Sequence, residues 1–279
     1  MHKLKQYYRL TGKILNPIKT TTLQFIKTHP AYVVLALLLF LQIPILIAGT
    51  DNRQAEAVSP EFLATLRPVA EPELSLEEMA LREADSIYNV LELDASGLST
   101  DAFELAYLGY YKLRDEGVVS KEGLLTIADF SKPSTEERLY VIDMDAQEIR
   151  FKTLVAHGRN SGKVYAESFS NQPQSNKSSL GFYLTLDTYM GGNGYSLKLR
   201  GLDKGLNDKA YERAIVMHGS DYVSEQFART NGYLGRSLGC PAVPQKLTKP
   251  IINTIKNGSV LFIYHPSANY RRQSTVLNS

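Results

Sequence analysis

The chain has 279 residues and a formal net charge of +2, with 22% of its residues charged. This balance excludes the strongly basic surface typical of a nucleic-acid-binding protein. The single cysteine, Cys240, cannot form an internal disulfide, and the histidines are too scattered for a metal site. No segment indicates a cofactor.

The N-terminal segment predicts a transmembrane anchor or a signal peptide. Residues 1–30 contain six basic residues and no acidic one, and residues 31–48 form an apolar run interrupted only by Gln42 and Pro44. A basic flank before such a run places the N-terminus in the cytoplasm and the rest of the chain outside. The run is at the lower limit for a membrane span and longer than a typical signal core. In both cases we expect the remainder to be periplasmic, either tethered to the inner membrane or released.

Two further segments precede the main domain. Residues 49–72 are polar and contain three prolines, which predicts a linker. Residues 73–120 predict a helical prefix. Apolar residues recur at helical spacing over 75–93, and a second helix is expected from Ser99 or Thr100, either of which can cap it, to about residue 117.

From residue 124 the pattern changes to short β-branched and aromatic runs bounded by turn residues, which predicts strands. The expected strands are 124–130, 138–144, 149–156, 180–186, 196–200, 213–218 and 259–264, with short helices near 222–228 and 245–256. Residues 159–179 are rich in Ser, Asn and Gly and predict a long loop. Residues 121–266 therefore predict a mainly β domain of the α+β class, followed by a loose tail at 267–279.

The residues around Cys240 suggest nucleophilic chemistry. A cysteine nucleophile needs a base for its proton and donors that stabilise an oxyanion. His218 closes an apolar run, so we expect it at the end of a buried strand, where a base can be held rigidly. Gly235 and Gly239 allow backbone N–H groups to converge beside the sulfur. The alternative is that Cys240 and His218 are buried structural residues.

Several separated segments resemble one family. They are Ala128-Asp129-Phe130-Ser131-Lys132-Pro133-Ser134, Arg138-Leu139-Tyr140-Val141-Ile142-Asp143, Val155-Ala156-His157-Gly158, Ser179-Leu180-Gly181-Phe182-Tyr183 and Gly205-Leu206-Asn207-Asp208. Together with His218-Gly219 and Gly235-Arg236-Ser237-Leu238-Gly239-Cys240-Pro241-Ala242-Val243, they make residues 98–266 resemble the murein L,D-transpeptidase catalytic domain of the YkuD-like superfamily.

The resemblance implies a β-rich catalytic domain that cuts and rejoins peptidoglycan stem peptides and is acylated by carbapenems. The thiolate would attack the bond before the terminal D-alanine of a tetrapeptide stem, and an amine of a neighbouring stem would resolve the acyl-enzyme. The implied nucleophile is Cys240 and the implied base is His218. The implied oxyanion donors are the backbone amides of Leu238, Gly239 and Cys240. The residues expected to bind or shape the substrate site are Arg236, Ser237, Gly219 and His157, with a structural role as the alternative for His157.

Two positions depart from the wider family. Leu238 stands where a histidine is usual, and Ala242 where Arg or Asn is common. Arg236 and Arg200 are candidates to supply the carboxylate-binding charge. Two alternatives to a transpeptidase stay open. One is an L,D-carboxypeptidase or cross-link hydrolase with the same nucleophile. The other is a non-catalytic peptidoglycan-binding domain, for which a thiol pKa near the ordinary value of about 8.5 is expected.

Overall fold

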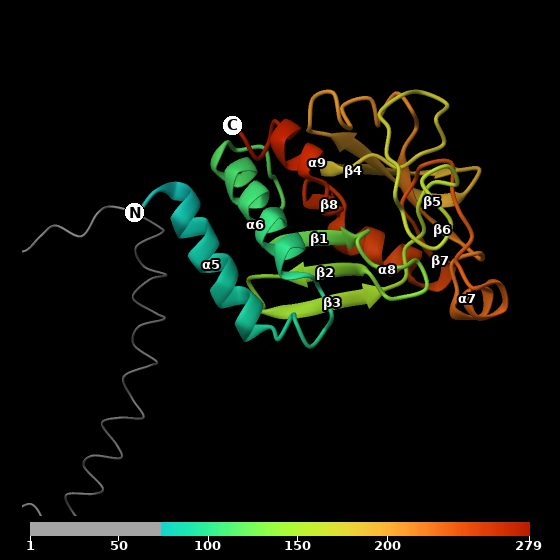
Figure 1. Cartoon of the computed structure of the whole chain (residues 1–279), viewed down its shortest axis with the longest axis horizontal. Coiled ribbons are helices and arrows are strands. Elements are labelled where there is room, and N and C mark those ends of the chain that lie inside the picture. Colours follow the sequence, from blue (N-terminus) through green and yellow to red (C-terminus); the bar gives the residue numbers. More distant parts are fainter. Residues whose placement is uncertain (1–73) are drawn as a thin grey trace, which may run out of the picture. The chain divides into compact units, whose positions relative to one another are not determined.

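The computed structural model describes residues 74–279 (Figure 1). The predicted anchor or signal segment at 31–48 and the linker at 49–72 lie outside the described residues. Within the described part, no helix combines the length and the apolar character needed to cross a membrane. This part contains one eight-stranded mixed sheet with helices packed against it, which confirms the predicted β-rich architecture.

The sheet consists of two halves joined by a strand that comes late in the chain. Its order is β3-β2-β1-β8-β4-β5-β6-β7. The bounds are β1 (Leu124–Asp129), β2 (Leu139–Asp143), β3 (Glu148–Thr153), β4 (Gly181–Gly191), β5 (Gly194–Gly201), β6 (Val216–Ser220), β7 (Ala242–Pro244) and β8 (Val260–Tyr264). The pairs β1–β8 and β6–β7 are parallel and the others antiparallel. Because β8 lies between β1 and β4, it connects the first three strands to the rest.

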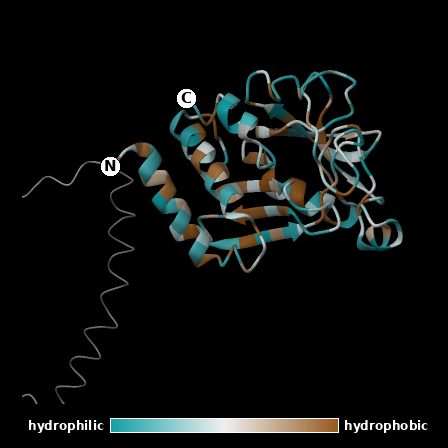
Figure 2. Cartoon of the chain, in the orientation of Figure 1, coloured by the Kyte–Doolittle hydropathy of each residue, from teal (hydrophilic) through white to brown (hydrophobic). Residues whose placement is uncertain are grey.

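Helices α5 (Leu76–Val90) and α6 (Thr100–Asp115) form the predicted prefix. Ser75 caps α5 in a capping box with Glu78, and Ser99 caps α6. Helix α6 packs on β1 and β8, and apolar residues gather along α6 and the central strands (Figure 2). Gly109 of α6 allows this close approach, because a side chain there would overlap the ring of Phe182 on β4. The prefix is therefore part of the same core.

The opposite end of the sheet carries Cys240 and His218, the candidate catalytic residues. There α7 (Glu225–Asn231) follows β6, and α8 (Gln245–Ile255) follows β7 and packs on β6 (Figure 1). His218 lies on β6, and Cys240 lies two residues before β7. The pairing of β6 with β7 thus brings together two segments that are far apart along the sequence.

Some expected bounds differ from the structure. The strand expected at 213–218 begins at Val216, because Ala214 has φ of +53°, a left-handed conformation that a strand does not accommodate. Strands β4 and β5 extend further and meet in a hairpin turn between Gly191 and Gly194. Helix α7 begins at Glu225 and not near 222. The three-residue strand β7 is too short for periodicity to reveal.

The prediction of a loose tail at 267–279 is corrected by the structure. Helix α9 (Ala268–Gln273) and the residues after it pack on the domain, and Tyr270, Val276 and Leu277 are buried. The buried carboxylate of Asp203 accepts hydrogen bonds from the Tyr270 hydroxyl (3.1 Å), the Ser274 hydroxyl (2.6 Å) and the Val276 N–H (3.2 Å). A buried charge requires such donors, and local composition does not show that this segment supplies them.

Candidate active site

Cys240 lies at the end of a turn formed by residues 235–239, and its side chain is only 9% exposed. The N–H of Val216 points at its sulfur with an N···S distance of 3.5 Å, and the sulfur lies 3.8 Å from the carbonyl oxygen of Ala214. Both contacts come from the segment that leads into β6. The thiol is therefore enclosed by backbone and has one N–H donor directed at it.

This enclosure determines the protonation state of the thiol. Burial raises the pKa of Cys240 above its ordinary value, while the Val216 N–H and the positive charge of Arg213 act in the opposite direction without outweighing it. The thiol is therefore protonated at neutral pH. A nucleophilic role requires a base that removes this proton as the attack occurs.

His218 of β6 is the candidate for that base. It pairs with Ala242 across β6 and β7, and Cys240 comes two residues before Ala242. This pairing places the segment that follows Cys240 beside the segment that contains His218. The His218 Nδ1 lies 3.0 Å from the carbonyl oxygen of Gly219, which can only accept, so Nδ1 carries the hydrogen. The lone pair of Nε2 is then available to take a proton.

Ser237 organises the turn before Cys240, as expected for a residue that shapes this loop. Its hydroxyl donates to the carbonyl oxygen of Cys240 at 2.6 Å and accepts from the N–H of Gly239 at 3.1 Å. Its own N–H donates to the carbonyl oxygen of His157, and its carbonyl accepts from the N–H of Arg159. Of the three amides expected to stabilise an oxyanion, that of Gly239 is thus already hydrogen bonded.

His157 has a different environment from the one expected of a residue that binds substrate. Its ring is fully buried, Nδ1 accepts from the guanidinium of Arg138 at 2.8 Å, and Nε2 lies 3.3 Å from the carbonyl oxygen of Gly162. Burial, and then the charge of Arg138, lowers the pKa of His157 to about 4. This environment favours the structural role that was the alternative for His157. The imidazole is an interior element, and the His157 backbone carbonyl fixes Ser237.

Gly219 and Arg200 also lie in positions other than those expected of residues that contact substrate. Gly219 is buried under the start of α8, where any side chain would overlap Gln245 and Thr248. Its role in the structure is close packing, together with the carbonyl that orients His218. Arg200 is exposed on β5 opposite Leu184, beyond the last β5 residue that pairs with β6. The structure does not bring it to Cys240.

Arg236 is a half-buried cation beside the turn. Its Nη1 donates to the carbonyl oxygen of Gly162 at 3.2 Å, and its guanidinium carbon lies 5.3 Å from the centre of the Tyr233 ring. The Nζ atom of the exposed Lys163 lies 4.7 Å from the centre of the same ring. Two cations therefore share one aromatic ring within the segments that surround the nucleophile, which is a suitable environment for an anion.

One charged residue near the thiol was not predicted from the sequence. Arg213 precedes β6 and lies close to both Cys240 and Gly239. Its only sequence signal is its place at the start of the run that ends in His218, and nothing in that run distinguishes it from a surface arginine. Arg213 is followed by Ala214, which has a left-handed conformation.

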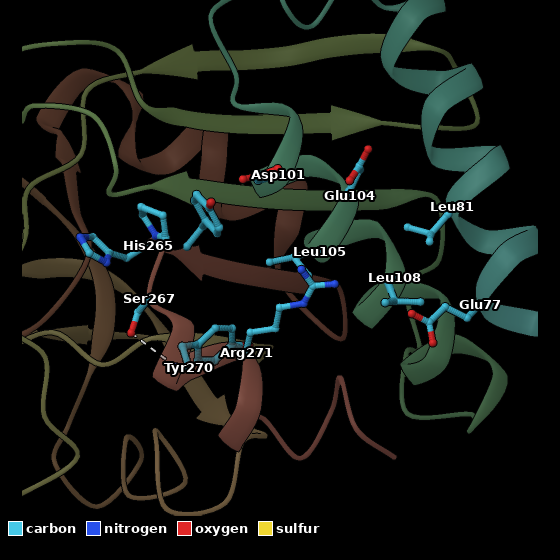
Figure 3. A pocket seen from close by; sticks show the side chains of 12 residues that line it. Glu77, Leu81, Asp101, Glu104, Leu105, Leu108, His265, Ser267, Tyr270 and Arg271 are labelled. Carbon is cyan, nitrogen blue, oxygen red and sulfur yellow. Dashed lines mark hydrogen bonds between the residues drawn. The ribbon is translucent and has the colours of Figure 1, made fainter.

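A separate cavity of about 320 Å³ lies away from these residues (Figure 3). It is lined by residues of α5, α6 and the segment from Tyr264 to Arg271, including Glu77, Glu104 and His265, and contains neither Cys240 nor His218. Among residues 74–279 there is no group of three or more side chains of the metal-ligating types arranged to hold an ion.

Comparison with known proteins gives a family match over this domain. A family model described as an L,D-transpeptidase catalytic domain matches residues 94–264. No curated protein matches the chain.

Similar solved structures include an L,D-transpeptidase from Mycobacterium smegmatis (11% identity, 51% of this chain and 59% of that chain, TM-score 0.32). A second is the helical cell shape determining protein Pgp2 from Campylobacter jejuni (13% identity, 57% and 55%, TM-score 0.34). The chain thus spans less than two thirds of the length of either protein. Identities and TM-scores this low give no information about individual residues.

Proposed function

The chain belongs to the L,D-transpeptidase catalytic domain family, and from this membership we propose that it is a peptidoglycan L,D-transpeptidase with Cys240 as nucleophile and His218 as base. The observation that carries the proposal is the pairing of β6 with β7. It brings the segment that follows the buried Cys240 beside the strand that carries His218, whose Nδ1 is bound to a carbonyl oxygen, and this supports the proposal. A purely structural cysteine needs no such partner.

In the first step His218 Nε2 takes the thiol proton, and the sulfur of Cys240 forms a bond with the carbonyl carbon that precedes the terminal D-alanine of a tetrapeptide stem. The C–N bond breaks, and D-alanine leaves as an amine after receiving that proton from His218. In the second step an amine of a neighbouring stem attacks the thioester. Its C–N bond forms, the C–S bond breaks, and the proton that the amine loses returns through His218 to the sulfur.

The oxyanion of each tetrahedral intermediate needs N–H donors near the sulfur. The amides of Leu238 and Cys240 flank the Gly239 amide, which donates to Ser237. Two donors are the number typical of oxyanion holes, so the amides of Leu238 and Cys240 are the proposed pair. Gly239 makes the turn possible, since its φ of +127° is unfavourable for residues with a side chain.

Stem peptides carry carboxylates, and the cations around Tyr233 are the proposed binding site for them. The guanidinium of Arg236 is held by the Gly162 carbonyl oxygen, and Lys163 is one residue further along the same loop. These two charges would compensate for Ala242, which stands where Arg or Asn is common in the wider family. The proposed location of the reaction is the periplasm, with residues 31–48 as anchor or signal.

A second candidate has a specific observation in its favour. The raised pKa of Cys240 and the absence of a histidine at position 238 also suit a non-catalytic peptidoglycan-binding domain, which would retain the fold without turnover. Hydrolysis of the same acyl-enzyme, giving an L,D-carboxypeptidase or cross-link hydrolase, uses the same groups in its first step. The products separate these possibilities.

The test is mass spectrometry of purified disaccharide-tetrapeptide incubated with the full-length protein, and in parallel with Cys240→Ala. Release of D-alanine that depends on Cys240, together with a cross-linked dimer, supports the transpeptidase. Release of D-alanine with a free tripeptide supports the carboxypeptidase. If no mass changes and no adduct forms on Cys240, the catalytic proposal fails and the binding domain is favoured.

A further inference from the structure

The segment from Arg213 to Val216 wraps around the sulfur of Cys240. The carbonyl oxygen of Ala214 and the N–H of Val216 contact the sulfur, and Arg213 begins the same turn. The Arg213 guanidinium reaches the turn before the nucleophile, where a side chain added at Gly239 would lie 3.3 Å from Nη2. A positive charge therefore stands beside the residue that directly precedes the thiol.

The hydrogen bonds of Arg213 show that its guanidinium is not free to bind a substrate. Its Nη1 donates to the carbonyl oxygen of Ser170 (2.7 Å) and the hydroxyl of Ser179 (3.0 Å). Its Nη2 donates to the carbonyl oxygen of Lys177 (2.6 Å) and the hydroxyl of Ser175 (3.3 Å). Four of the five guanidinium N–H groups are therefore in use, which leaves too few for a bidentate bond to a carboxylate.

All four acceptors are uncharged, so these bonds hold the guanidinium in place without cancelling its charge. They also fix the loop against the nucleophile turn. The Lys177 carbonyl oxygen, which Arg213 holds, would lie 2.8 Å from a side chain at Gly239. The neighbouring Ser178 hydroxyl donates to the Gly239 carbonyl oxygen at 3.1 Å.

We propose that Arg213 is a positioning residue whose fixed charge stabilises the Cys240 thiolate while its hydrogen bonds hold residues 170–179 on the nucleophile turn. The effect of Arg213 on catalysis rests on the proposed function. Its effect on the ionisation of the Cys240 thiol does not. An exposed arginine without four partners would be screened by water. Here the low mobility and partial burial make the charge effective.

Other charged or titratable groups face the thiol and must be controlled for. They are Tyr222 from the loop after β6, whose pKa burial raises, and His218 of β6, which the proposed function makes the base for the thiol. Tyr222 carries no positive charge, and His218 is cationic only after it has taken the proton. Substitution of Arg213 therefore removes one positive charge, while His218 and the Val216 N–H remain in the variant.

The experiment is the pH dependence of iodoacetamide alkylation of Cys240, followed by intact mass on the full-length protein without substrate. The variants are Arg213→Met, Arg213→Lys, and Arg150→Met as a control that removes an equal charge from β3 at the other edge of the sheet. In Arg213→Met the alkylation midpoint is expected to rise by about 0.5–1 pH unit, which is about a three- to tenfold slower reaction below the midpoint. Arg213→Lys should keep the midpoint near the wild-type value, and Arg150→Met should not change it.

A midpoint that stays constant or falls in Arg213→Met overturns the proposal. If Arg213 only held residues 170–179 in place by hydrogen bonds, its loss would expose the thiol and speed its alkylation. Should Arg213→Met not fold, Arg213→Gln, which keeps hydrogen-bond donors, replaces it in the same comparison. Failure of the proposed function is distinguishable: the midpoint can shift as expected in a protein that releases no D-alanine. Conversely, if the wild type releases D-alanine and the midpoint of Arg213→Met is unshifted, the proposed function holds and the proposed role of Arg213 is wrong.

Discussion

The buried imidazole of His157 makes a quantitative prediction about acid stability. In the folded protein its pKa is lowered from 6.5 to about 4 by burial and by the adjacent Arg138. Protonation would place a second positive charge beside the guanidinium and remove its acceptor. Since the folded state binds the proton more weakly than the unfolded state, the contribution of His157 to stability is complete above pH 6.5. It decreases as the pH falls from 6.5 to 4.

The difference of about 2.5 pH units corresponds to about 3 kcal/mol at about 1.36 kcal/mol per unit, as an upper bound. The measurement is urea unfolding at several pH values between 7 and 4 for the wild type and for His157→Gln. Glutamine can accept from Arg138 and donate to Gly162 without titrating. Subtracting the two curves removes the titration of the carboxylates, which both proteins share. The wild-type advantage should shrink by up to about 3 kcal/mol over this range.

A difference between the two proteins that stays flat from pH 7 to pH 4 would refute the reasoning. It would mean that His157 titrates in the folded protein as it does in the unfolded chain, and so that its ring is reached by water. A role in contacting substrate would then return for this residue. The same experiment therefore decides between the two functions considered for His157.

Three other outcomes follow from the structure. Cys240→Ala should lose both release of D-alanine and the adduct formed with a carbapenem, yet keep its melting temperature within a few degrees because only one buried sulfur is removed; intact mass and thermal melting check this. Asp203→Ala should lower the free energy of unfolding by about 3–5 kcal/mol in urea titrations, since several buried donors lose their acceptor and the segment after β8 is released. In steady-state kinetics Lys163→Ala should raise KM for the tetrapeptide about three- to tenfold and leave kcat nearly unchanged. An exposed cation that binds substrate and transition state equally affects only binding, so a fall in kcat alone would contradict this.

Much of the secondary structure could be predicted because its causes are local. Ser75 and Ser99 precede amphipathic segments that begin where the caps predict. The strands from β1 to β3 follow from β-branched runs between turn residues. The sequence also predicted Cys240 and His218 as partners from a lone cysteine in a glycine-containing turn after a His-Gly motif, and this stays a prediction.

The remaining features depend on contacts between distant residues. Nothing near Tyr270 indicates that its hydroxyl meets Asp203, and nothing near His157 indicates that Arg138 occupies its Nδ1. Nothing in the run that ends in His218 indicates that Arg213 lies beside Gly239. In each case the partner is set by packing, and sequence patterns describe only the exposed or buried tendency of one segment.

The central place of β8 has a consequence for how the protein is made. In the described sheet β8 joins the strands β1–β3 to β4–β7 and is the last strand in chain order, and the segment after β3 also bridges β7 through Ala156 and Ala242. Before residues 260–264 emerge, the edges of β1 and β4 that β8 will cover are unpaired, and the long-range pairing that joins them is slow to form. The nascent chain therefore carries two open, apolar sheet edges during synthesis. The sheet is therefore complete only after β8 has been inserted between β1 and β4.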